Sequence, residues 1–303
     1  MVDLIPLFKI DLKNEKKIKI SSMCFGPNGF LYVSDYNEHC IQVFDQDGHL
    51  KFSFGSEGSE IGQFLYPSKI CFGTNGLLYV FDGWNHRIQV FDQEGDFKFA
   101  IGPFNILHEM CFGPNGLLYM FFVWDKCVHV FDQDCNFKFK FGSYGKENGQ
   151  FGSIRELCFG PNELLYVCDS RNHRIQVFDQ DGDFKFKFGS KGSENGQFKS
   201  PYRLFFGPND LLYVCDSRNH RIQVFDQDGH FQFTFGSEES ENIQFKFPHV
   251  LCFGPDDLLY IFISDISQIQ VFQSKKNQSL YQILAFSLFE TKNHKKKKTL
   301  LKK

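Results

Sequence analysis

The chain has 303 residues, of which 42% are hydrophobic and 23% charged, and its formal net charge at pH 7 is −3. A charge this small gives no global attraction to a polyanion, so a nucleic-acid site would have to be a local basic patch. No apolar run approaches the length of a membrane span, and the apolar start of the chain carries Asp3 and Lys9. We therefore expect neither a signal peptide nor a membrane partner.

The first predicted element is a β-strand over residues 4–11, LIPLFKID, which a polar linker follows at residues 13–17. This strand precedes every repeat described below, so it is a candidate to pair with the last repeat and close a ring. Residues 280–289 are a second candidate for the same place, because they follow the last repeat. The sequence leaves this choice open.

A Phe-Gly pair marks six copies of one unit. The pairs are Phe25-Gly26, Phe72-Gly73, Phe112-Gly113, Phe159-Gly160, Phe206-Gly207 and Phe253-Gly254. Successive pairs are 47, 40, 47, 47 and 47 residues apart. A period in the forties is typical of repeat architectures in which one unit cannot bury its apolar face and neighbours must stack. The 40-residue step contains the short connection Gly102-Pro103-Phe104, which lacks seven residues that other connections have.

Each unit contains four short apolar runs. In the fourth copy they are residues 157–159, 164–168, 174–178 and 184–188, here named strands a, b, c and d. They are rich in Val, Ile, Tyr and Phe, and turn residues separate them, which predicts β-strands. Gly-Pro-Asn-Gly turns close the a–b hairpins, and Asp-Gln-Asp-Gly turns close the c–d hairpins. Six such meanders predict an all-β, six-bladed β-propeller, whereas the coils of a parallel β-helix are shorter and lack tight hairpins.

Two copies depart from this pattern between strands b and c. Copy three has FFVWDKC at residues 121–127 where copy four has CDSRNHR at residues 168–174, and copy six has residues 263–268 in that place. The apolar pattern of the strands survives in both copies, so we expect both blades to form.

The ten cysteines have the spacing of neither a disulfide framework nor a zinc site. One repeated position before the Phe-Gly pair holds five of them, and the end of strand b holds two: Cys24, Cys71, Cys111, Cys158 and Cys252, then Cys168 and Cys215. Equivalent positions lie around a ring, too far apart to pair, and no Cys-x-x-Cys occurs. We therefore expect reduced and mostly buried thiols, with the irregular Cys40, Cys127 and Cys135 exposed, and no metal or cofactor. No catalytic residue stands out, because every candidate is repeated.

The sequence DSRNHRIQVF at residues 169–178 recurs unchanged at residues 216–225 and nearly unchanged at residues 82–91. It resembles the NHL repeat, as does the connection GSENGQF at residues 192–198. This resemblance, from residue 18 to about residue 273, implies a six-bladed propeller used mostly as a binding platform. Such propellers are often the substrate-recognition end of tripartite-motif-type ubiquitin ligases. No RING or B-box precedes residue 18, so the resemblance implies recruitment of a partner rather than ligase activity in this chain.

The repeated Asp and His residues of the b–c turns are interpreted as structural. Asp side chains accept backbone N–H bonds, so we expect Asp82, Asp169 and Asp216 to cap these turns. The repeated histidines are expected to hydrogen-bond within the same turns rather than to bind a metal; they are His86, His173 and His220.

Positions that vary against this constant frame are the candidates for ligand contact. Two residues before the His position, blades one to six carry Asn37, Trp84, Trp124, Arg171, Arg218 and Asp265. The entries to strand a open on the same face of a propeller as the b–c turns. We predict a ligand-binding face formed by Trp84, Trp124, Arg171, Arg218, Lys69, Arg155, Tyr202 and Arg203. Aromatic and guanidinium groups suit stacking on unpaired bases and contact with phosphates, and they are also frequent hot spots of protein interfaces.

Three functions remain open. The first is a non-catalytic platform that recruits a protein partner, as in ubiquitin-dependent degradation. The second is binding of single-stranded RNA through the b–c face. The third is a metal-dependent enzyme, because NHL-like propellers include an amidating lyase whose metal lies in the central channel. That resemblance would need a set of inward-facing histidines, which the sequence does not show.

The predicted organisation has three parts. Residues 1–17 are an N-terminal strand and linker, residues 18–289 are the propeller, and residues 290–303 are a basic disordered tail. The repeats span about 18–64, 65–103, 104–151, 152–198, 199–245 and 246–289. We expect a cytoplasmic monomer or weak oligomer, with the basic tail allowing a nuclear location.

Overall fold

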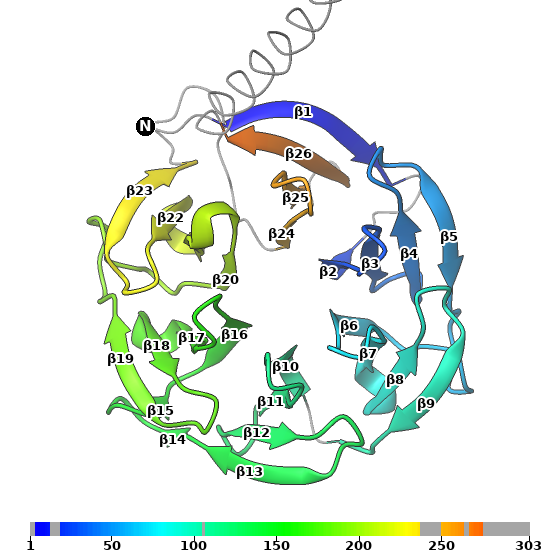
Figure 1. The fold of residues 1–303 in the computed structure, drawn as a ribbon, viewed down its shortest axis with the longest axis horizontal. Helices are drawn as coiled ribbons and strands as arrows, with labels where there is room; N and C mark the ends of the chain where they lie inside the picture. Colours follow the sequence, from blue (N-terminus) through cyan, green and yellow to red (C-terminus); the bar gives the residue numbers. More distant parts are fainter. Residues whose placement is uncertain (1–3, 13–18, 105–106, 237–249, 264–266, 275–303) are drawn as a thin grey trace, which may run out of the picture.

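Six antiparallel sheets of four strands are arranged as blades around a central axis (Figure 1). The computed structural model describes residues 4–12, 19–104, 107–236, 250–263 and 267–274. In these residues the only helices are 3-10 turns of three residues, η1 (Gly83–Asn85), η2 (Ser170–Asn172), η3 (Pro208–Asp210) and η4 (Ser217–Asn219). The predicted all-β, six-bladed β-propeller is therefore confirmed.

In every blade the first strand named lies nearest the central axis and the last lies at the outer edge of the ring (Figure 1). Blade one is β2 (Ile20–Phe25), β3 (Leu31–Asp35), β4 (Cys40–Phe44) and β5 (Leu50–Phe54). Blade two is β6 (Pro67–Phe72), β7 (Leu78–Asp82), β8 (Arg87–Phe91) and β9 (Phe97–Ile101). Blade three is β10 (Leu107–Phe112), β11 (Leu118–Phe122), β12 (Val128–Phe131) and β13 (Phe137–Phe141).

Blade four is β16 (Ile154–Phe159), β17 (Leu165–Asp169), β18 (Arg174–Phe178) and β19 (Phe184–Phe188). Blade five is β20 (Arg203–Phe206), β21 (Leu212–Asp216), β22 (Arg221–Phe225) and β23 (Phe231–Phe235). Blade six is β24 (Leu251–Phe253), β25 (Leu259–Ile263), β26 (Gln268–Ser274) and β1 (Leu4–Asp11). A short parallel pair, β14 (Ser143–Tyr144) and β15 (Gln150–Phe151), lies in the connection that leads into blade four.

The hairpins form because the turn residues supply the required backbone angles. Gly29 closes the first a–b turn with φ +75°, and Gly48 closes the first c–d turn with φ +82°. Both angles are left-handed, where glycine has no Cβ penalty. In the c–d turn the Asp45 carboxylate accepts hydrogen bonds from the N–H groups of Asp47 and His49, at 3.1 and 2.8 Å. The register of each meander is therefore fixed locally.

The ring is closed by the two ends of the repeat region. β1 pairs antiparallel with β26, from Leu4 opposite Ser274 to Asp11 opposite Gln268, and thus forms the outer strand of blade six (Figure 1). Residues 280–289, the other candidate for this place, lie outside the described residues. The Ile10 side chain of β1 is 1% exposed and packs in the apolar cluster between blades six and one. Blade six therefore depends on a strand from the opposite end of the chain.

Adjacent blades meet through one repeated aromatic contact. The Tyr of each strand b packs edge-on against the Phe of the next strand a, with ring centroids 4.7–5.0 Å apart. The six pairs are Tyr32–Phe72, Tyr79–Phe112, Tyr119–Phe159, Tyr166–Phe206, Tyr213–Phe253 and Tyr260–Phe25. The last pair returns to blade one, so the contacts form a closed cycle.

Loss of the buried β1 contact should destabilise the whole ring. Ile10→Ala is expected to lower the free energy of unfolding by about 2–5 kcal/mol, because it leaves a cavity at the closure. Leu7→Ala on the same strand is the matched control, since Leu7 is 47% exposed and should cost less than about 0.5 kcal/mol. Urea unfolding of both variants measures this difference. Equal losses would contradict the role of β1 as the closing strand.

Candidate binding face and central channel

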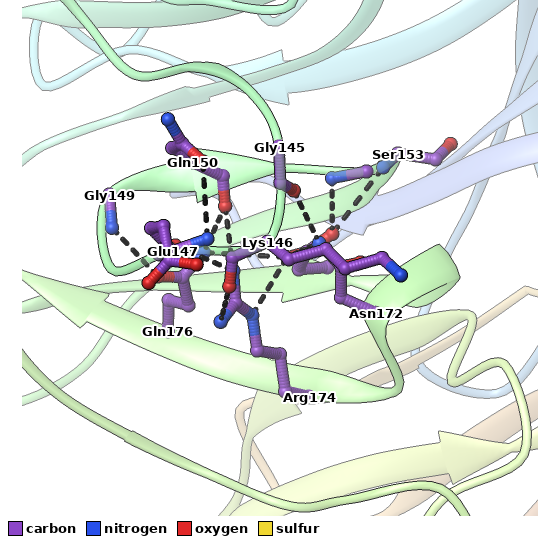
Figure 2. A network of polar contacts seen from close by, with 11 residues as sticks. Gly145, Lys146, Glu147, Gly149, Gln150, Ser153, Asn172, Arg174 and Gln176 are labelled. Carbon is purple, nitrogen blue, oxygen red and sulfur yellow. Dashed lines mark hydrogen bonds and ion pairs between the residues drawn. The ribbon is translucent and has the colours of Figure 1, made fainter.

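The repeated Asp, Asn, Arg and Gln residues hold the connection between two blades (Figure 2). In blade four, Asn172 donates to the Gly145 carbonyl at 2.8 Å, and Arg174 donates to the carbonyls of Lys146, Glu147 and Gln150 at 2.7–2.9 Å. Gln176 donates to the Gln150 carbonyl and accepts from the Gly149 N–H. The Asp169 carboxylate orients the set, because it accepts from Asn172 at 2.8 Å and from Arg174 at 2.9 Å. These side chains satisfy backbone groups that no strand pairs with.

The same clamp recurs in blades two and five. Asp82 accepts from Arg87 at 2.8 Å, and Asp216 accepts from Arg221 at 2.9 Å. Each carboxylate also accepts a backbone N–H from the preceding d–a connection, that of Leu65 or Lys199, at 2.7 Å. The prediction that these aspartates cap their own turns is therefore corrected: none of the three caps the 3-10 turn that follows it.

The histidine of the b–c turn also reaches out of its turn. The Nδ1 atom of His173 accepts the Ser200 N–H at 2.9 Å, and Nδ1 of His39 accepts the Tyr66 N–H at 3.0 Å. Both bonds go to the next d–a connection, so the expectation of side-chain bonds within the turn was wrong for His173. His173 itself has φ +56°, which ends η2. These histidines therefore help to join one blade to the next.

The b–c turns and the entries to the inner strands lie at the same end of each blade. In blade four Ile154 pairs with Asp169, and in blade two Pro67 pairs with Asp82. We call this side of the ring, with its b–c turns and d–a connections, the b–c face. Trp84, Trp124, Arg171 and Arg218 all lie there and are exposed, Trp84 by 66% and Trp124 by 74%. Among the described residues, neither arginine forms a salt bridge.

The other four predicted residues lie at the mouth of the central channel and are half-buried. Lys69 contacts Glu109 and lies 2.7 Å from Glu156, while Arg203 contacts Glu156 and lies 3.3 Å from Glu109. Four side chains thus meet here, one from the inner strand of each of blades two to five. We call them the channel tetrad: Lys69, Glu109, Glu156 and Arg203. Each of the two cations is ion-paired with both carboxylates, so neither Lys69 nor Arg203 is left without an acidic partner.

Arg155 and Tyr202 complete this region. The Arg155 guanidinium lies over the Tyr202 ring at 5.3 Å, and the Arg203 guanidinium lies at 5.7 Å from the same ring. The Nη1 atom of Arg155 also lies 3.2 Å from Nε2 of His108. Burial and the neighbouring Arg155 lower the pKa of His108 to about 4, so this imidazole is neutral at pH 7.

The two carboxyl groups of the tetrad differ in their protonation. Burial and the nearby Glu156 raise the pKa of Glu109 to about 7. Burial alone would raise the pKa of Glu156 as well, but Arg203 and Lys69 together lower it. Glu156 is therefore the permanent anion of the pair, and Glu109 takes up a proton near neutral pH.

Beneath the tetrad, the channel contains a cavity of about 190 Å³. Its lining includes five thiols, those of Cys24, Cys71, Cys111, Cys158 and Cys252. Burial raises the pKa of each of them, to about 12 for Cys158, so they are neutral thiols. All ten cysteines are free in the structure. The expected exposure of Cys127 was wrong, because it is buried beside the Gly142 carbonyl.

Among the described residues, groups that could hold a metal ion are found in two c–d turns: Asp45, Asp47 and His49 in blade one, and Asp226, Asp228 and His230 in blade five. In both turns the first Asp already accepts two backbone N–H bonds that shape the turn. The described part of the chain contains no helix that is long and apolar enough to cross a membrane.

Sequence reasoning found the exposed residues of the b–c face but missed the acidic half of the tetrad. Glu109 and Glu156 occupy the same register position as Lys69 and Arg203 in neighbouring copies. The order Lys, Glu, Glu, Arg at this position of four successive inner strands could have predicted the tetrad. Side chains at the same height on neighbouring inner strands face one another across the narrow channel. The fold then pairs these residues across the channel.

Comparison with known families and proteins agrees with this geometry. The family model of the NHL repeat matches residues 19–44, 64–91, 151–178 and 204–225, which lie in blades one, two, four and five. A 49-residue segment is 39% identical to the protein brain tumor of Drosophila melanogaster. That segment is 16% of this chain and 5% of the fly protein, so this chain matches only a small part of its relative.

Solved structures share the fold at low sequence identity. A virginiamycin B lyase from Staphylococcus aureus has a TM-score of 0.62 at 14% identity, over 90% of this chain and 99% of the lyase. An auxiliary nutrient binding protein from Bacteroides thetaiotaomicron has a TM-score of 0.64 at 16% identity, over 84% of this chain and 69% of that one. Because an enzyme and a binding protein both match, the likeness concerns the fold and not the activity.

The raised pKa of Glu109 makes stability depend on pH. The folded state binds a proton more tightly than the unfolded state, whose Glu pKa is near 4.5. This contribution is full below pH 4.5 and is lost as the pH rises through about 7. Relative to Glu109→Gln, which stays neutral, the natural chain should therefore lose about 3 kcal/mol of unfolding free energy between pH 5 and 8.

Urea unfolding at several pH values measures this difference. Glu57→Gln is the matched control, because Glu57 is exposed and its replacement should leave the difference from the natural chain constant with pH. A constant difference between the natural chain and Glu109→Gln would contradict the assignment.

Proposed function

Because the chain is a six-bladed β-propeller of the NHL-repeat family, we propose that it is a non-catalytic platform that binds a protein partner through the b–c face. The observation that carries this proposal is the distribution of exposed large apolar side chains. Of the seven in the described residues, four lie in b–c turns or d–a connections: Ile61, Trp84, Trp124 and Tyr144. Exposed aromatic side chains and arginines on one face are typical of protein interfaces.

The channel supports a binding role rather than a catalytic one. The channel tetrad occupies the mouth with paired charges, and the described residues place one histidine there, His108. A lyase of the kind considered above would need several inward-facing histidines around a metal. The partner would thus contact the rim of the b–c face, with the ion-paired tetrad as its floor.

Single-stranded RNA is a second candidate, and Arg171 and Arg218 favour it. Both are exposed, and both are separated along the rim from Trp84 and Trp124, as stacking and phosphate contact would require. However, Lys69 and Arg203 are already ion-paired with Glu109 and Glu156, so these two cations are engaged within the chain rather than open to a phosphate backbone. A protein partner is therefore the first choice.

In its finer form, the proposal makes the propeller an adaptor that presents its partner for ubiquitination by a separate ligase subunit in the cytoplasm. The relation to NHL propellers of ubiquitin ligases supports this form. Its test is the half-life of the captured partner in cells with and without the chain. An unchanged half-life would contradict the adaptor role and leave the binding role in place.

Substitutions on the b–c face should separate the two ligands. With a protein partner, the Trp84→Ala/Trp124→Ala double variant should lose at least about 2 kcal/mol of affinity, and added RNA should not compete. With single-stranded RNA, each lost stack should cost about 1–3 kcal/mol, and Arg171→Ala/Arg218→Ala should flatten the log–log salt slope by about 0.7 per phosphate contact.

The measurement is a pull-down with and without nuclease, followed by affinity titration of the captured partner. Leu50→Ala/Phe137→Ala is the matched control, because these two side chains are exposed by 56% and 54% and follow c–d turns on the opposite face. Since Trp84 packs on Tyr66 at 4.8 Å, the melting temperature of each variant is checked first. If both double variants bind like the control, the b–c face is not the binding surface.

A further inference from the structure

Blade three lacks the clamp that holds the d–a connections before blades two, four and five. Where blade four has Asp169, Asn172, Arg174 and Gln176, blade three has Phe122, Asp125, Cys127 and His129. The connection that such a clamp would hold is shortened as well, running only from the end of β9 at Ile101 to the start of β10 at Leu107. The two departures occur together, so the side chains at the clamp positions of blade three do not have to hold a connection.

A pocket of about 320 Å³ takes the place of the clamp. Its walls are the aromatic side chains of Phe104, Phe122, Trp124 and Phe131, and Asp125 and His129 supply the polar groups. The Phe104 ring lies 6.1 Å from that of Phe122 and 6.3 Å from that of Phe131. We call this site the blade-three pocket. Its size is at the lower end of the range for small-molecule sites.

The shortened connection explains why the pocket is open. Phe104 stands eight residues before the Phe-Gly pair of its blade, as do Phe64, Phe151 and Phe198. Those three are 0% exposed and lie under connections of full length. Phe104 is only half-buried. At this repeated position, the Phe104 side chain therefore forms a wall of the pocket rather than part of the core.

The chemistry of the pocket favours a cation. Aromatic faces carry negative charge density, and Trp attracts cations more strongly than Tyr or Phe does. Trp124 of the pocket is 74% exposed. The Oδ2 atom of Asp125 lies 2.5 Å from Nε2 of His129, while Oδ1 has no partner among the described residues. An apolar occupant would strip water from this carboxylate without replacing its bonds.

The same walls disfavour a primary ammonium group. Lysine carries three N–H donors that aromatic rings accept poorly, and its hydration would be lost on entry. A methylated ammonium keeps the charge, sheds the donors and fills an aromatic cage by contact. We propose that the blade-three pocket binds a methylated ammonium group, carried by a methyl-lysine side chain of the protein partner. This inference rests on the proposed protein-binding function, from which it takes the peptidic source of the ligand.

Calorimetric titration with single amino-acid probes tests the pocket itself. The probes are N-acetyl trimethyl-lysine amide, N-acetyl lysine amide and the neutral analogue in which carbon replaces the quaternary nitrogen. The trimethylated probe should bind about tenfold more tightly than either of the others, which corresponds to the upper range of cation–aromatic energies. Equal binding of the neutral analogue would overturn the proposal, because the pocket would then be a simple apolar slot.

Two variants locate the binding. Trp124→Ala and Asp125→Asn should each weaken the trimethylated probe about tenfold, and both side chains are exposed, so the fold should persist. Leu50→Ala is the matched control, because Leu50 is 56% exposed and follows a c–d turn on the opposite face. Leu50→Ala should bind the probe like the natural chain. Unchanged binding by Trp124→Ala would overturn the site.

The source of the ammonium group is tested separately. Cosedimentation with phosphatidylcholine vesicles should show no binding, and vesicle binding that Trp124→Ala abolishes would overturn the peptidic source. Failure of the proposed function is a different result, since it concerns the partner's affinity for the b–c face. If the probe binds to the pocket but the partner's affinity is the same for the natural chain and for the Trp and Arg variants, the pocket is established and the proposed binding role of the b–c face is refuted.

Discussion

The structure depends on the fact that no blade can bury its own faces. Each four-stranded sheet presents a row of aromatic rings to the next, and the edge-on contact of a strand-b Tyr with the following strand-a Phe is repeated without a break from Tyr32 to the return at Phe25. Such a pair adds about 0.5–1.5 kcal/mol to the burial of its rings. Stability is thus shared around the circle, and the strand that closes it, β1, matters to every blade.

This arrangement separates the residues that hold the ring from those that are free to bind. The Asp, Asn, Arg and Gln positions of blades two, four and five are engaged with the preceding connection, and their spacing is what makes the repeat recognisable in sequence. Blade three has a shortened connection and no clamp, yet Tyr119 and Phe159 keep its place in the cycle. Blade three can therefore contain a pocket while its aromatic contact with blade four stays intact.

Much of the fold could be read from the sequence because each element is specified locally and repeated. The Phe-Gly pairs, the Gly29 and Gly48 turns and the apolar runs give strand, hairpin and blade number directly. The closing strand could not be chosen, since residues 4–11 and 280–289 are both apolar and only tertiary pairing distinguishes them. Lys69 and Arg203 were placed on an open face because their partners, Glu109 and Glu156, come from other blades. The opening beside Phe104 depends on the path of a connection, which no local pattern encodes.

The strict repetition of blades four and five has a consequence for how the chain reaches this state. Residues 164–182 and 211–229 are identical over 19 positions, from strand b through the c–d turn. A strand from one copy could therefore pair in the place of the other with the same side-chain contacts, in one molecule or between two. Blades three and six have different sequences between strands b and c, so their strands do not offer this exchange.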